Sequence, residues 1–355
     1  MNMPISVSVR TNEVEYSFEL NRKVTIITGY SGTGKTTLSM AVLNKNNSDF
    51  YEERISNPTY SLSCIYGADW KETLEGIIKG AKNGKRRIII FDDSDIIFSR
   101  EFAMVFKEDN WNLYIFINRF QNTSERSLSS IPFSIDSVYN LVSSGAKHWL
   151  EPKYNLESDC NNDYDCIITE DSGVGYKFLL LFNENISTAR GKDKIIKLLL
   201  DNVEKLRNKR ILLFVDLASY GSCLSSLLSI ASSFNLDISL VENYECFEYL
   251  LLNSFFLKRS KEVQSWLAYS KSIDAVATYQ SSEKMYEDLL YKSTEGTRYE
   301  LRHGSKNLRS CYVVNCCPSN PCSFYIKGNK QISMFYKTQW QDLFKSIRAA
   351  KLLKI

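Results

Sequence analysis

The eight residues 29–36 read GYSGTGKT, and they constrain the architecture of this chain more than any other segment. They fill every fixed position of the pattern G-x-x-x-x-G-K-[ST], in which a glycine-rich turn joins a strand to a helix. The short apolar run 24–27 precedes the turn, and the apolar-rich segment 38–43 follows it. A buried strand, the turn and a helix packed on a sheet are therefore predicted in that order.

The residue types in this turn suit the binding of a polyphosphate. Glycines permit dihedral angles at which successive backbone N–H groups point inward, and the N-terminus of the next helix adds positive potential. Lys35 is expected to reach the β- and γ-phosphates of ATP, and the Thr36 hydroxyl to ligate Mg²⁺. The predicted nucleotide-binding residues are Gly29, Tyr30, Ser31, Gly32, Thr33, Gly34, Lys35, Thr36 and Thr37.

The composition is that of a globular protein. Of 355 residues, 44% are hydrophobic and 24% charged, and the formal net charge is +3. The length allows two domains, and so small a net charge does not by itself indicate nucleic acid. No apolar stretch is long enough to cross a membrane without charges, and the start of the sequence lacks the basic and apolar regions of a signal peptide. We therefore expect a cytoplasmic protein with no membrane partner.

The chain has nine cysteines, an odd number that argues against a simple disulfide framework. Four of them cluster near the C-terminus, and their spacing is not the paired C-x-x-C of common zinc sites. Free thiols are the expectation. The alternative is a structural zinc ion at Cys311, Cys316, Cys317 and Cys322.

A second apolar run ends on two carboxylates: residues 86–93 read RRIIIFDD. A central parallel strand delivers acids in this way to the C-terminal edge of its sheet. The run resembles the Walker B element of P-loop NTPases, which implies that Asp92 holds Mg²⁺ and that Asp93 polarises the attacking water. Many hydrolases of this class carry glutamate at the second position. The alternative, a turn that caps the next helix, is compatible with a metal role for one of the two acids.

A third apolar run, residues 113–117, ends in Asn118 and Arg119. This resembles the sensor position of additional-strand NTPases. The resemblance implies that Asn118 orients the water and that Arg119 contacts phosphate in the same or a neighbouring subunit. The alternative is a strand end that becomes polar where it reaches solvent.

Further elements of a first domain, residues 1–150, follow from their patterns. A hairpin is expected over 7–20, strands over 61–66 and 137–142, and a helix over 69–82. The next helix is expected to contain residues 96–98, 102 and 105. Residues 151–165 read as a polar linker.

Residues 166–260 repeat a strand–helix rhythm in which apolar strands end at Glu170, Asp216 and Glu242. Strands are expected over 166–169, 211–215 and 236–241, with helices over 176–182, 192–206, 221–233 and 245–252. Such alternation implies a parallel sheet with acids gathered along one edge. Residues 261–355 are expected to form a helical, cysteine-containing extension.

This second region resembles a Toprim domain, the metal-dependent module of topoisomerases, primases and overcoming-lysogenisation-defect nucleases. The resemblance covers residues 164–252 and implies a metal site at Glu170 and Asp216. Ala218 stands where the family has a second aspartate, so Asp171 or Glu242 substitutes for it or the site is inactive. The alternative is a generic doubly wound domain whose acids merely end strands.

The fold class predicted from these features is α/β: a P-loop NTPase parallel sheet followed by a second α/β, Toprim-like domain. This layout is similar to that of the overcoming-lysogenisation-defect nucleases. It implies an ATP-hydrolysing protein that acts on DNA or RNA, in the manner of an ATP-gated nuclease of phage defence. The predicted catalytic residues are Lys35, Asp92, Asp93, Asn118, Glu170 and Asp216, and the predicted metal ligands are Thr36, Asp92, Glu170 and Asp216.

Two other functions stay open at this stage. One is a nucleotide-dependent switch whose C-terminal domain binds a partner protein, or a second copy of the chain, without catalysis. The other is a phosphotransferase that acts on a small molecule. Basic residues interleaved with Tyr and Trp form either a nucleic-acid face or a solvated helical surface. They are Lys258, Arg259, Lys261, Lys271, Lys284, Arg298, Arg302 and Lys306.

Overall fold

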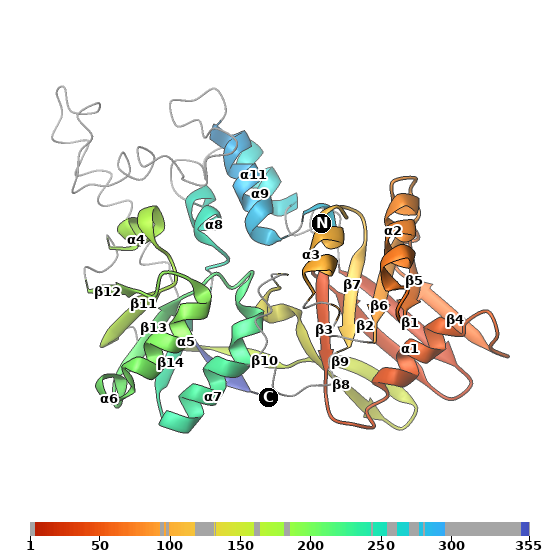
Figure 1. Cartoon of the computed structure of the whole chain (residues 1–355), viewed down its shortest axis with the longest axis horizontal. Helices are drawn as coiled ribbons and strands as arrows, with labels where there is room; N and C mark the ends of the chain where they lie inside the picture. The colour runs from red at the N-terminus through yellow and green to blue at the C-terminus, as the bar shows by residue number, and fades with distance from the viewer. Residues whose placement is uncertain are drawn as a thin grey trace.

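The computed structural model describes residues 4–92, 96, 99–117, 131, 133–159, 164–180, 185–242, 244–253, 261–269, 277–279, 281–294 and 349–354. These residues contain two β-sheets, of nine and six strands. In Figure 1 the first sheet, coloured red to yellow, lies on the right and the second, mostly green, lies on the left. Each sheet has helices packed on it, as an α/β fold requires.

The centre of the first sheet is parallel and fully buried. Its strands lie in the order β3-β7-β6-β5, and every residue of β3 and β7 is buried. Continuous apolar strands are expected where helices cover both faces of a sheet. All four strands were predicted from the sequence, and they are β3 (Val24–Thr28), β5 (Tyr60–Ile65), β6 (Arg86–Phe91) and β7 (Leu113–Ile117).

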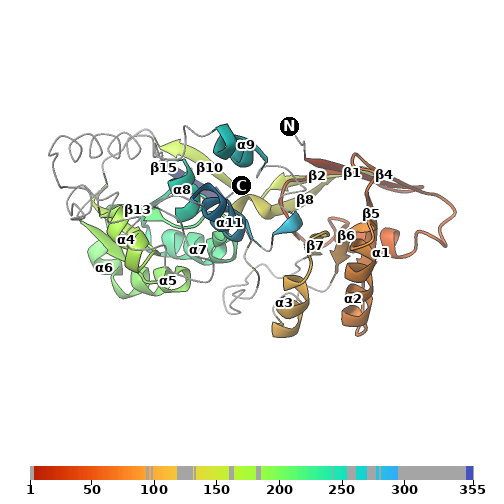
Figure 2. The same ribbon diagram turned by 90° about the horizontal axis from the view of Figure 1, so that it is seen from above.

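Three helices accompany this centre, and Figure 2 shows α2 and α3 on the same side of the sheet. They are α1 (Lys35–Leu43), α2 (Trp70–Ala81) and α3 (Arg100–Lys107). The helix expected to contain residues 96–98 begins only at Arg100. Its start is set by Ser99, whose hydroxyl accepts a hydrogen bond from the Phe102 N–H at 3.0 Å.

The predicted hairpin is confirmed, and it extends the same sheet. Strands β1 (Ile5–Thr11) and β2 (Glu15–Leu20) pair antiparallel, with Ile5 opposite Leu20. Strands β8 (Val138–Ser144) and β9 (Lys147–Pro152) connect the hairpin to the centre, because β8 pairs with β3 and β9 pairs with β2. Only β8 was predicted. Strand β4 (Tyr51–Ile55), which pairs with β1, was not predicted either.

The second sheet has the order β10-β15-β14-β13-β11-β12, and its last four strands are parallel. They are β11 (Cys166–Thr169), β12 (Ile186–Thr188), β13 (Arg210–Phe214) and β14 (Asp237–Val241). The other two, β10 (Tyr154–Asp159) and β15 (Ala349–Lys354), pair antiparallel. The structure therefore differs from the expected linker and extension, because residues 154–159 and 349–354 are strands of this sheet. Strand β12 was also not predicted.

Helices cover both faces of the second sheet, as Figure 2 shows. One core joins Ile211 and Leu213 to α5 and α7, and the other joins Leu212 and Phe214 to α8, α9 and α11. The predicted helix 192–206 is broken at Asn202. The helices are α4 (Gly173–Leu179), α5 (Lys192–Asp201), α6 (Val203–Leu206), α7 (Leu224–Phe234), α8 (Phe247–Leu252), α9 (Lys261–Tyr269) and α11 (Ser282–Thr294). A short 3₁₀ helix, Tyr220–Cys223, precedes α7.

A search of the described residues for a helix that is both long enough and apolar enough to span a bilayer finds none.

Candidate nucleotide site and acidic edge

The turn between β3 and α1 closes around the ammonium group of Lys35. The Lys35 Nζ donates hydrogen bonds to the carbonyl oxygens of Gly29 (2.9 Å) and Tyr30 (2.6 Å) and to Thr33 Oγ1 (3.1 Å). Lys35 is buried at 7% exposure. A buried ammonium is stable only when oxygen atoms surround it. The loop therefore holds a positive charge at its centre.

The N-terminus of α1 adds to this positive potential. Its cap residue is Gly34, which has no side chain to accept from the first amides, and the first turn contains no acidic residue. Gly34 has φ 88°, in the left-handed region that glycine adopts without strain. Thr36 and Thr37 are exposed in this first turn, and Tyr30 is 76% exposed at the rim of the loop. The ammonium, the helix N-terminus and the Thr36 hydroxyl together suit a polyphosphate with its Mg²⁺ ion.

Asp92 lies at the same edge of the sheet as this loop. It follows β6 directly and is 4% exposed. The neighbouring strand β5 carries Cys64, and burial together with the charge of Asp92 raises the pKa of the Cys64 thiol to about 12. Strand β7 separates β6 from β3, which is the position that an additional strand takes between the loop strand and Walker B. Asp93, Asn118 and Arg119 lie outside the described residues, and their roles stay predictions.

Two buried side chains, which the sequence did not predict there, contact the loop. The Tyr16 hydroxyl donates a hydrogen bond to the Gly34 carbonyl oxygen at 2.8 Å, and the Tyr16 ring lies 4.6 Å from that of His148. Alternation along β2 could have placed Tyr16 on the buried face. Only the pairing of β2 with β9 brings His148 beside it, and no sequence signal predicts that pairing.

In the second sheet, Glu170 and Asp216 come together as predicted. They follow the adjacent parallel strands β11 and β13, and the Asp216 backbone N–H donates a hydrogen bond to Glu170 Oε1. Asp171 lies next to them and accepts a hydrogen bond from the Tyr244 hydroxyl at 2.7 Å. Three carboxylates thus gather at the C-terminal edge of this sheet, which we call the acidic edge.

Burial and mutual repulsion make the acidic edge unfavourable for negative charge. Burial raises the pKa values of Glu170 and Asp171, and it raises that of Asp216 strongly, with the charges of Glu170 and Asp171 adding to the effect. Burial also raises the pKa of Glu248 on α8 to about 7. The Asp216 Oδ1 atom is buried with no hydrogen-bond partner.

No group of three or more His, Cys, Asp or Glu side chains in the described part of the chain is arranged to hold a metal ion. The arrangement of Glu170 and Asp216 therefore does not by itself form a metal centre. The cysteines proposed for zinc, at 311–322, lie outside the described residues.

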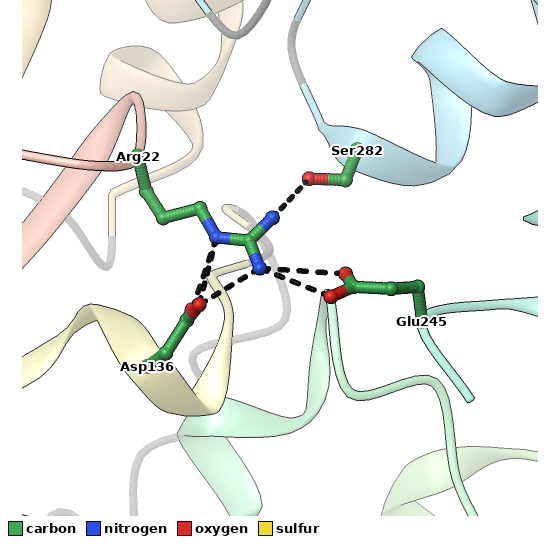
Figure 3. A network of polar contacts seen from close by, with 4 residues as sticks. All are labelled: Arg22, Asp136, Glu245 and Ser282. Atoms are coloured by element: carbon green, nitrogen blue, oxygen red, sulfur yellow. Dashed lines mark hydrogen bonds and ion pairs between the residues drawn. The ribbon is translucent and has the colours of Figure 1, made fainter. Parts of the chain in front are cut away.

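Arg22 connects the two sheets, as Figure 3 shows. It stands between β2 and β3. Its Nη2 lies 2.8 Å from Asp136 Oδ2 and 3.1 Å from Glu245 Oε1, and its Nη1 donates to the Ser282 hydroxyl at 3.3 Å. Asp136 precedes β8 of the first sheet, whereas Glu245 and Ser282 follow β14 in the chain. We call these four residues the Arg22 clamp.

Backbone hydrogen bonds link the same parts of the molecule. The Ile135 N–H donates to the Leu217 carbonyl at 3.2 Å, and the Gly221 N–H donates to the Phe133 carbonyl at 3.0 Å. A side chain at position 221 would overlap Phe133, since its Cβ would lie 2.5 Å from the Phe133 ring. We call the loop between β3 and α1, residues 29–34, the NTP loop. The turn that carries Asp216 is therefore packed directly on the half of the molecule that contains this loop.

Comparison with known proteins agrees with the geometry of the first sheet. The family model described as ATPase family associated with various cellular activities (AAA) matches residues 25–131. No curated protein and no solved structure matches the chain. The matched range contains β3 from Thr25 onward, the loop around Lys35, and Asp92 at the end of β6. This part of the chain is similar to AAA ATPases and forms a P-loop NTPase domain.

Proposed function

We propose that this chain hydrolyses ATP at the loop between β3 and α1. The proposal depends on the Lys35 ammonium held by three oxygen atoms at the N-terminus of α1. A triphosphate entering the loop replaces these oxygen atoms as the partners of Lys35, so the charge is in place before the ligand arrives. The match of residues 25–131 to AAA ATPases supports the same assignment.

Each residue at this site has a separate proposed role in ATP hydrolysis. Lys35 and the first amides of α1 bind the phosphates and offset their charge. Thr36 and Asp92 supply the oxygen ligands that a Mg²⁺ ion needs, and the ion, when bound, stabilises charge on the transferring phosphoryl group. Asp93 is the proposed base for the attacking water, and Asn118 is proposed to orient it.

The test is Lys35→Ala in the full chain. ATP turnover should fall about 100-fold or more, because a charge that stabilises the transition state is removed. Lys79→Ala, at an exposed lysine of α2, is the matched control and should keep wild-type turnover. Calorimetric titration with ATP and Mg²⁺ measures binding in parallel. A Lys35→Ala variant that hydrolyses ATP at the wild-type rate would refute the site.

We further propose that the second sheet acts on nucleic acid under the control of ATP, as a Toprim-like domain. Two observations support this. Strand β12 makes β13 the third parallel strand along the chain, so that Glu170 follows the first strand and Asp216 the third, as in the Toprim pattern. The Asp216 Oδ1 atom is buried without a hydrogen-bond partner, so it could serve as one of the several oxygen ligands that a divalent cation needs.

Glu170→Gln tests this second activity. The substitution should abolish cleavage of DNA or RNA in the presence of Mg²⁺ or Mn²⁺ while leaving ATP binding unchanged. Glu204→Gln, at an exposed position of α6, should cleave like wild type. If the wild-type protein cleaves neither nucleic acid with either metal, the second domain is not a nuclease.

A second candidate function is then a nucleotide-dependent switch that binds a protein partner or a second copy of the chain. Two contacts between the halves of the molecule favour it specifically. Arg22, which precedes β3, bonds to Glu245, and the turn after Asp216 bonds through Leu217 and Gly221 to residues 133–135, which precede β8. Such contacts give two domains a physical means of sensing each other.

A further inference from the structure

Two buried aromatic side chains pack against the end of the NTP loop. Tyr16 on β2 and His148 on β9 occupy paired positions in adjacent parallel strands. Tyr16 is fully buried and His148 is 8% exposed. Neither residue belongs to the segment 25–131 that resembles AAA ATPases. The hairpin and β9, which lie outside that segment, therefore supply part of the wall of the nucleotide site.

The rings leave no space at Gly34. A Cβ atom at this position would lie 2.7 Å from His148 Nε2 and 3.0 Å from the Tyr16 hydroxyl oxygen. The left-handed φ of Gly34 would strain any residue with a side chain, independently of this crowding. The backbone at the end of the loop is thus in direct contact with both side chains.

The Tyr16 hydroxyl controls the orientation of one peptide unit. The Gly34 carbonyl oxygen accepts from the Leu38 N–H at 3.0 Å and from the Tyr16 hydroxyl at 2.8 Å. In a trans peptide the C=O of one residue and the N–H of the next point in opposite directions. Holding the Gly34 carbonyl against Tyr16 and Leu38 therefore turns the Lys35 N–H away from them, toward the side of the loop that faces the phosphates.

We propose that Tyr16, braced by His148, is a positioning residue for the phosphates of the bound nucleotide. It acts through the Gly34–Lys35 peptide and does not itself touch the ligand. This inference rests on the proposed ATP-binding function. It adds that the N-terminal hairpin, and not the loop sequence alone, orients an amide that grips the phosphate.

The chemistry of both rings agrees with this role. Burial raises the pKa of Tyr16 to about 12, so its hydroxyl remains a donor at neutral pH. His148 Nδ1 lies 3.2 Å from the Ala146 carbonyl oxygen. A proton on Nδ1 satisfies that carbonyl and holds the imidazole ring in place beside Tyr16.

The experiment compares full-length wild type with Tyr16→Phe, which removes one hydroxyl and keeps the ring. Dissociation constants for ATP with Mg²⁺ and for inorganic tripolyphosphate are measured by calorimetry. Both should rise about fivefold, the usual effect of losing one neutral hydrogen bond. The two should rise by the same factor, because the amide contacts phosphate and not the base.

Tyr51→Phe is the matched control. Its hydroxyl donates to Glu53 Oε2 at 2.9 Å on β4 of the same sheet and does not contact the loop. It should lose thermal stability without any change in ATP affinity. If Tyr16→Phe does not fold, His148→Asn serves in its place. It removes the imidazole ring that packs against Tyr16 and should also raise both dissociation constants.

The possible outcomes distinguish a failure of this inference from a failure of the proposed ATP-binding function. A wild-type chain that binds no ATP overturns the proposed function, and the role of Tyr16 with it. A wild-type chain that binds ATP, with Tyr16→Phe binding equally well at a reduced melting temperature, overturns the positioning role alone.

Discussion

Lys23 is a lysine whose ammonium group is buried where the two halves of the molecule meet. Its Nζ donates to the carbonyl oxygens of Asp109 and Ala277 and lies 5.0 Å from the centre of the Phe106 ring. Burial lowers its pKa from 10.5 to about 8. Between these pH values the unfolded chain holds a proton that the folded chain has lost, so the free energy of unfolding should rise with pH by up to about 3 kcal/mol.

Lys23→Met tests this at the residue scale. The substitution should remove this rise of the unfolding free energy with pH. The stability of wild type relative to Lys23→Met should therefore increase as the pH is raised from 8 to 10.5. Urea unfolding at a series of pH values measures the difference, and exposed Lys85→Met controls for the loss of a lysine. Parallel curves for wild type and Lys23→Met would show that folding does not lower the pKa of Lys23.

Single residues also show what the sequence can reveal of a site. The loop residues were predicted because the chemistry requires neighbours in the chain at fixed spacing. Tyr16 and His148 were missed because they reach Gly34 only through strand pairing. Asp216 was predicted as the end of an apolar strand, but its buried and unpaired Oδ1 atom is a property of packing alone.

At the scale of elements, long apolar patterns predicted which segments form strands and helices more accurately than they predicted the residues at which these begin and end. Helix α3 illustrates the reason. Its predicted start included residues 96–98, which continue the apolar pattern, whereas the structure begins the helix at Arg100, after the capping hydroxyl of Ser99. Edge strands carry charged residues: β10 lies in the segment predicted to be a linker, and β4 was not predicted. Their place in a sheet comes from partners distant in the chain.

Ser99→Ala should therefore destabilise the first domain through α3. Loss of the hydrogen bond to the Phe102 N–H at 3.0 Å costs about 1 kcal/mol of unfolding free energy. The effect reaches the core because Phe102 and Phe106 are buried against β6 and β7. Ser99→Asp, which keeps an acceptor at the cap, should retain the stability measured by denaturant unfolding. Equal stability of Ser99→Ala and wild type would mean that the cap does not set the start of this helix.

At the scale of the whole molecule, the Arg22 clamp joins the nucleotide half to the acidic edge. Removing the cation leaves the Asp136 and Glu245 carboxylates near each other without their shared partner. Because the Arg22 side chain is only 18% exposed, this costs about 1–2 kcal/mol at the contact. Arg22→Leu should therefore loosen the contact between the halves without unfolding either.

Hydrogen exchange at the backbone amides of the turn 216–221, measured with and without ATP and Mg²⁺, tests whether nucleotide binding is coupled to the acidic edge. In the wild type, nucleotide binding should slow exchange at these amides, because the turn bonds to residues 133–135, which lead into β8 beside the loop strand. Arg22→Leu should bind ATP within about twofold of wild type, since Arg22 does not contact the loop, and should lose the protection. The control variant Arg54→Leu removes an exposed ion pair with Glu52 and should keep the nucleotide-dependent protection of the turn. Protection that survives in Arg22→Leu would mean that the nucleotide signal reaches the acidic edge by another route.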